Sequence, residues 1–177
     1  KDDFVSNAAT IPEIESLLDS PQDRIDFLRV LATGQERAGK WDQALEAYLQ
    51  LVKIVGRDDP LLTLKMGRSA RLSHVVRSRL EKLRGQLSAS GRARMARWVE
   101  QEATALSNLD QADANRQRRA FFFFFPYDSA SLKLKRQWIT GIPANVQSLR
   151  VMQELVKMRQ SGNEEHARWA TAEQAFR

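Results

Sequence analysis

The sequence predicts an all-α protein in which αα-hairpins stack side by side as a right-handed α-solenoid of about four hairpins. Apolar residues recur at three- and four-residue spacing along most of the 177 residues, which is the period of one face of an α-helix. Glycines separate several of these stretches, as expected at corners between helices. The spacing from Gly39 to Ala44 is repeated from Gly162 to Ala167, which indicates a second, degenerate copy of one hairpin.

The clearest hairpin lies between residues 21 and 55. Ser20 precedes Pro21, so the first helix has a capping hydroxyl and a proline in its first turn, where the missing N–H costs nothing. Gly39 ends this helix because glycine enters the left-handed conformation without a Cβ clash, and a second helix begins at Trp41. The short turn predicts an antiparallel return. The two apolar stripes are Ile25, Leu28, Leu31 and Ala32, and Trp41, Ala44, Leu45, Tyr48, Val52 and Val55.

This hairpin resembles a tetratricopeptide repeat, in which small residues allow close helix approach and aromatic residues fill the space between hairpins. The chain departs from the family pattern at Gln35, where an aromatic residue is usual, and in the exit from Gly56 to Pro60. The resemblance implies a helical-repeat fold whose surface binds a protein or peptide. The residues that carry it are Leu28, Ala32, Gly39, Trp41, Ala44, Tyr48 and Leu51.

The hairpin is expected to belong to one helical-repeat domain over residues 11–177, preceded by an extended lead-in over residues 1–10. A short helix over 11–18, with Ile14, Leu17 and Leu18 on one side, is expected to cap the first hairpin. Phe121–Phe125 cover every side of a final helical turn, so we expect them to pack in the core. Further helices are predicted to begin within 61–66 and to cover 68–87, 92–107, 110–125, 129–139, 145–156 and 164–176.

Length and composition do not identify the compartment of the chain. No apolar run approaches the roughly 20 residues that cross a bilayer, and no cysteine is present for a disulfide or a thiolate site. The order of the helices also resembles the helical region of large bacterial proteins with a downstream PQQ-type β-propeller, chiefly at Arg77–Leu83 and Phe124–Asp128. That resemblance implies a helper module, a fragment of a larger protein, with export to the periplasm as one option, and it carries over no quinone-binding residue. The lack of a long apolar run separately predicts that the chain is soluble.

The charge is unevenly distributed, although the net charge is +6. Residues 1–59 hold 12 acids and 7 bases, residues 60–177 hold 10 acids and 21 bases, and Lys65–Arg97 sets ten bases against Glu81 alone. Such a stretch can bind nucleic acid, as can the smaller cluster of Lys133, Lys135, Arg136 and Trp138. It can equally dock against the acidic residues 1–59 of a second copy or against the rest of a parent chain.

Reactive groups are scarce. His74 and His166 are the only histidines; the first is expected on the surface and the second at a solvated helix terminus. No nucleophile elbow, zinc-protease helix or phosphate-binding glycine loop occurs. The sequence therefore predicts a protein that is not an enzyme and has no cofactor or metal.

The function predicted from these observations is a helical scaffold or interaction module that binds a protein or peptide segment or supports adjacent domains. Nucleic-acid binding through residues 65–97 is the alternative, and the oligomeric state stays open. Partner contacts are expected from exposed polar residues, namely Arg29, Gln35, Arg71, Arg77 and Arg84.

Overall fold

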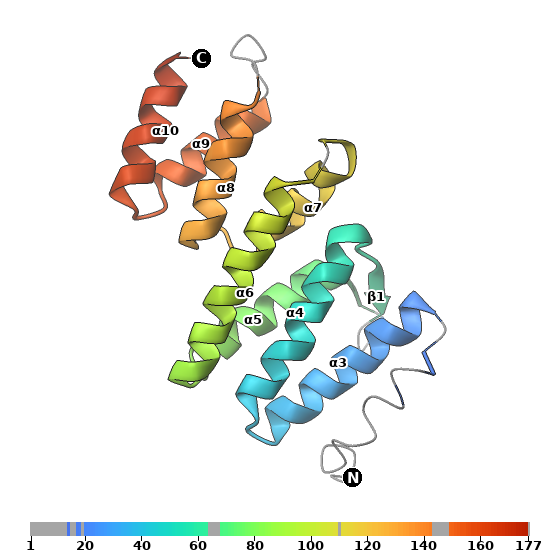
Figure 1. Cartoon of the computed structure of the whole chain (residues 1–177). Coiled ribbons are helices and arrows are strands. Elements are labelled where there is room, and N and C mark those ends of the chain that lie inside the picture. Colours follow the sequence, from blue (N-terminus) through green and yellow to red (C-terminus); the bar gives the residue numbers. More distant parts are fainter. Residues whose placement is uncertain are drawn as a thin grey trace. The chain divides into compact units, whose positions relative to one another are not determined.

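A computed structural model describes residues 20–63, 68–109, 111–142 and 149–176, together with residues 14, 17 and 18. This part of the chain is mostly helical and includes one small two-stranded sheet, so the predicted all-α class is confirmed at that level (Figure 1). The elements are α3 (Pro21–Arg37), α4 (Trp41–Arg57), β1 (Leu61–Thr63), β2 (Ser69–Arg71), α5 (Leu72–Arg84), α6 (Ala89–Ser107), α7 (Gln111–Phe124), α8 (Ser129–Thr140), α9 (Leu149–Arg159) and α10 (Glu164–Phe176).

The chain divides into two compact units, Lys1–Arg97 and Trp98–Arg177, and α6 runs through the boundary. We predicted one domain over residues 11–177. This division into compact units does not test that prediction. The predicted lead-in over residues 1–10 lies outside the described residues, as does most of the helix predicted over 11–18. Leu17 is described there and is 75% exposed, so its predicted place on a buried apolar side is wrong.

The helical hairpin predicted over 21–55 is present in the first unit. Ser20 Oγ accepts the backbone N–H of Asp23 at 3.0 Å, which caps α3 as expected. Gly39 takes a φ of +70° in the turn, the conformation for which glycine is suited. α3 and α4 lie side by side beyond that turn (Figure 1). Their facing stripes are buried, including Leu28, Ala32, Ala44, Leu45, Tyr48 and Leu51.

A short β-hairpin replaces the helix predicted to begin within residues 61–66, so that prediction is wrong at its described start. β1 and β2 pair antiparallel with Leu61 opposite Arg71. Leu62 is buried between two exposed neighbours, which is the two-residue period of a strand rather than a helix. Pro60 precedes the strand and disfavours the helical conformation for the residue before it.

The helix predicted over 68–87 is shortened by the same hairpin and spans Leu72–Arg84 as α5. The carboxylate of Asp59 sets the start, because it accepts both the backbone N–H of Ser73, at 2.9 Å, and its hydroxyl, at 2.8 Å. Apolar residues spaced three or four apart along this stretch are buried, namely Leu72, Val76, Leu80, Leu83 and Leu87.

The phenylalanine run lies in the core of the second unit. Phe121, Phe122, Phe124 and Phe125 are buried, which confirms the prediction for these four rings. The rings of Phe121 and Phe125 are 5.3 Å apart between centroids, and Trp98 lies 5.7 Å from Phe125. Pro126 follows the run, and α8 begins at Ser129 after Asp128 in the N-cap position.

A separate part of that core joins α8, α9 and α10, and its buried residues are Leu132, Ile139, Val151, Leu155, Met158 and Ala170. α9 and α10 form the second helical hairpin, with Gly162 at a φ of +74° in its turn (Figure 1). Val156, on α9, is 41% exposed and lies outside this core. Asn145 and Val146, predicted to begin this helix, lie outside the described residues.

Candidate functional site

The five residues predicted to contact a partner lie on α3 and on or next to α5 in the first unit. On α3, Arg29 is partly exposed and forms an ion pair with Asp26 at 2.9 Å. Gln35, one turn and a half further along, is only 7% exposed, and its Oε1 has no hydrogen-bond partner. The prediction that Gln35 is exposed is therefore wrong. Gln35 lies on the face of α3 that also buries Leu28, Leu31 and Ala32.

The other three predicted contacts lie on or next to α5. Arg71 donates to the carbonyl of Asp59 at 2.9 Å, and Arg77 bonds Glu81 at 2.8 Å on the same helix. Arg84 is exposed at the end of α5 and lies seven residues after Arg77, so these two share a face. Arg77 and Arg84 therefore share a basic face of α5, and part of its charge is paired locally.

The charge asymmetry of the sequence is partly neutralised inside the first unit. Glu36 on α3 accepts the hydroxyl of Tyr48 at 2.7 Å and pairs with Arg79 on α5 at 3.0 Å. Glu46 on α4 pairs with Arg94 on α6 at 2.7 Å. Acids of the first hairpin thus pair with bases of the stretch from Lys65 to Arg97 in the same chain. Burial, followed by the hydrogen bond to Glu36, raises the pKa of Tyr48.

A third contact between the first hairpin and the stretch from Lys65 to Arg97 lies at the start of α6. Asp42 on α4 accepts the hydroxyl of Ser88 and, at 3.2 Å, its backbone N–H. Ser88 Oγ in turn accepts the backbone N–H of Gly91 at 3.0 Å. The side-chain hydrogen bond from Ser88 is the main cause that lowers the pKa of Asp42. A Cβ at Gly91 would lie 2.2 Å from Asp42 Oδ1, so a larger residue there would displace this carboxylate.

The smaller basic cluster predicted at residues 133–138 is not a continuous basic surface. Lys135 is 1% exposed; its Nζ pairs with Glu154 at 3.0 Å and lies 5.2 Å from the centre of the Phe122 ring. Arg136 pairs with Glu165 at 3.2 Å. Phosphate contact by Lys135 is therefore a wrong expectation. Burial lowers the pKa of this lysine, and Glu154 offsets only part of the effect.

Glu154 holds two lysines, since Lys157 also pairs with it, at 2.7 Å. Burial by itself raises the pKa of Glu154, but the hydrogen bond from Lys157 and the charge of Lys135 outweigh it and hold the pKa below its usual range. The cluster is a charged part of the core rather than a binding surface.

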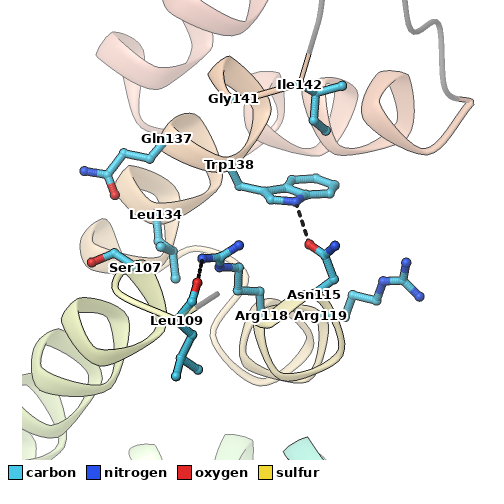
Figure 2. A pocket seen from close by; sticks show the side chains of 10 residues that line it. All are labelled: Ser107, Leu109, Asn115, Arg118, Arg119, Leu134, Gln137, Trp138, Gly141 and Ile142. Atoms are coloured by element: carbon cyan, nitrogen blue, oxygen red, sulfur yellow. Dashed lines mark hydrogen bonds between the residues drawn. The ribbon is translucent and has the colours of Figure 1, made fainter. Parts of the chain in front are cut away.

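The second unit contains a partly polar cleft of about 440 Å³, within the size range of small binding pockets. It lies where the end of α6 meets α7 and α8. Trp138 Nε1 donates to Asn115 Oδ1 at 3.1 Å across it (Figure 2). The Trp138 ring also lies 6.2 Å from that of Phe122, so the indole is held from the core side. The lining residues are Ser107, Leu109, Asn115, Arg118, Arg119, Leu134, Gln137, Trp138, Gly141 and Ile142.

Two arginines supply the charge of this cleft. Arg118 is turned toward the end of α6, where it donates to the carbonyls of Leu106, at 3.0 Å, and Leu109, at 3.2 Å (Figure 2). Arg119 extends beside Asn115, is exposed and has no ion-pair partner among the described residues. These residues were not predicted as a site. The available signal was an Arg-Arg pair directly before a phenylalanine run, which places charge at the edge of a buried turn.

Other kinds of site receive little support. His74 is exposed as predicted, whereas His166 is 8% exposed, so its predicted solvated position is wrong. Asn163 Oδ1 caps α10 by accepting the backbone N–H of His166 at 3.1 Å. Within the described ranges no group of three or more His, Cys, Asp or Glu residues could hold a metal ion. None of the helices there is long and apolar enough to cross a bilayer.

Fold and site together define a mostly helical protein with a half-polar cleft built around an anchored tryptophan. No protein-family model matches the chain, and no curated protein or solved structure matches it significantly.

Proposed function

We propose that the chain is a non-catalytic interaction module that binds a segment of another protein, or of a larger parent chain, in the cleft between α7 and α8. The observation that carries the proposal is the immobilised indole of Trp138, which lines the cleft and is held by Asn115 and Phe122. A fixed aromatic side chain loses little conformational entropy on binding, and such residues dominate the binding energy of protein interfaces.

The tetratricopeptide-like solenoid is part of the same proposal. Its support is the repetition of one corner: Gly39 and Gly162 both have positive φ between paired helices, and Ala44 and Ala167 follow them at equal spacing. Stacked hairpins of this kind present extended surfaces that bind peptide segments.

Protein binding is favoured over nucleic-acid binding by the state of the basic residues. Phosphate binding depends on cations that can exchange their counterions for the nucleic acid. Several bases of the stretch from Lys65 to Arg97 already have partners within the chain. These are Arg71, Arg77, Arg79, Arg92 and Arg94.

A selection from a random library of twelve-residue displayed peptides tests the proposal. We expect a family of peptides to be enriched on the wild-type chain and to bind it in solution. Trp138→Ala should weaken their binding by about tenfold or more, as expected for a central aromatic contact. Trp41→Ala, which changes the same residue type in the first unit, serves as the control.

Failure to enrich any peptide that binds in solution would contradict the proposed function. Tight binding of a thirty-residue oligothymidylate, falling steeply as salt rises, would favour nucleic acid instead.

A further inference from the structure

The cleft between α7 and α8 has an excess of positive charge. Among the described residues that line it, the titratable ones are Arg118 and Arg119, and none is an acid. Arg118 uses its Nε and Nη2 for the carbonyls at the end of α6. Arg119 has no such partner in the part of the chain that the structure describes. Its guanidinium can therefore donate to a new carboxylate without breaking an ion pair with a described residue.

A second donor is oriented by the indole of Trp138. An indole N–H can only donate, so Asn115 must present its carbonyl oxygen to Trp138. This fixes the amide and leaves both N–H groups of Asn115 Nδ2 for another acceptor. Arg119 follows Asn115 by four residues on α7, so the two side chains share one face of the helix (Figure 2).

The same cleft has an apolar part. Leu109 is 40% exposed, and Ile142 and Trp138 are partly buried at its edge. A ligand that satisfied only the donors would leave this surface in water, whereas an extended peptide offers a carboxylate and a neighbouring apolar side chain together. A uniform polyanion such as a nucleic-acid backbone matches the charge of the cleft but not its apolar part.

We infer that this cleft recognises an acidic residue next to an apolar residue in a partner segment, the carboxylate binding Arg119 and Asn115 and the apolar side chain packing on Trp138. The inference rests on the proposed function and adds the chemistry of the partner.

The peptides enriched from the twelve-residue library give the first test. They should carry Asp or Glu beside an apolar residue more often than the unselected library. Replacing that acid by its amide in the best peptide should weaken binding by about tenfold, the usual scale for losing a charge-assisted contact. Fluorescence anisotropy of the labelled peptide measures the change.

Variants of the chain give the second test. Arg119→Gln and Arg119→Glu should both weaken the acidic peptide by about tenfold or more, and Asn115→Ala by less. Arg116→Glu is the matched control, because Arg116 is exposed on the same helix and does not line the cleft. It should change binding less than about twofold. Thermal unfolding of each variant confirms that it is folded.

The results separate the inference from the proposed function. Enriched peptides that lack an acid, or that bind Arg119→Glu as well as wild type, would overturn the inference and leave the interaction module standing. Equal losses in Arg116→Glu and Arg119→Glu would also overturn it, since net charge alone would then explain binding. If no peptide is enriched, the proposed function fails, and this inference fails with it.

Discussion

Both units of the molecule contain ion pairs between helices, and one pair from each unit shows how much their burial differs. Glu46 and Arg94 in the first unit are 51% and 44% exposed. Lys135 and Glu154 in the second are 1% and 14% exposed. The exposed pair loses little hydration when it forms, and it contributes little to the free energy of unfolding. The buried pair is expensive to desolvate, so each ion depends on the other. Where a pair lies therefore matters more than its distance.

The largest effect is expected from Glu154→Ala in the second unit. Removing this carboxylate leaves Lys135 charged in the core, and the free energy of unfolding should fall by roughly 3 kcal/mol or more. Lys135→Met should cost about 1 kcal/mol, because Glu154 keeps Lys157 and the aliphatic stem is replaced. Urea denaturation measures both, and Glu164→Ala, at an exposed ion pair, is the control. Similar costs for all three would show that burial does not distinguish the pairs.

A smaller effect is expected from Tyr48→Phe in the first unit. Tyr48 is buried and donates to Glu36, and losing a hydrogen bond to a charged group costs about 2 kcal/mol. The folded state raises the pKa of Tyr48, so its stabilising contribution is present below the ordinary tyrosine pKa of about 10 and is lost as pH rises above it. Chemical denaturation between pH 7 and 11 should show a decline that is shallower in Tyr48→Phe. Parallel declines would contradict the linkage.

Gly91→Ala tests the cap between α4 and α6. The new Cβ displaces the Asp42 carboxylate from Ser88, and the lost cap costs about 1 kcal/mol. In an Asp42→Ala background the same change meets no carboxylate and should stabilise by about 0.5 to 1 kcal/mol, the usual gain of alanine over glycine in a helix. A double-mutant cycle by thermal unfolding measures this reversal of sign.

Gly85→Ala is the matched control for Gly91→Ala, because a Cβ there meets its nearest atom at 3.7 Å. Additive effects of Asp42→Ala and Gly91→Ala would show that the carboxylate does not restrict the glycine.

The smallest effect is expected from Arg94→Ala. Its ion pair with Glu46 is exposed, so the loss should be slight at low salt and should disappear near 1 M salt, where the Debye length is about 3 Å. Differential scanning calorimetry at two salt concentrations makes the comparison. A large loss of stability that persists in high salt would show that this exposed pair behaves like the buried one.

Much of the helical fold could be predicted because its causes are local. Ser20, Pro21 and Gly39 mark the first hairpin within a few residues of each end, and the apolar period identifies its buried faces. The β-hairpin could not be predicted in this way. It depends on the pairing of Leu61 with Arg71 and on the hydrogen bond between Asp59 and Ser73. Both join residues ten or more positions apart, so a local sequence pattern does not reveal them.

The candidate site was harder to predict than the fold. Arg77 and Arg84 were found on one face, as a helical period predicts, but Gln35 and Lys135 were buried despite their polarity. Their burial depends on partners or neighbours from other helices. The cleft depends on Asn115 and Trp138, which are joined by a hydrogen bond across 23 positions. A residue-type pattern cannot contain that information.

The caps of α5 and α6 have a consequence for synthesis. Both helices begin on a carboxylate supplied from upstream, Asp59 for α5 and Asp42 for α6. A ribosome makes the chain from the N-terminus, so each carboxylate leaves the exit tunnel before the helix that needs it. The carboxylates that hold the first residues of α5 and α6 are therefore already in place when these two helices emerge.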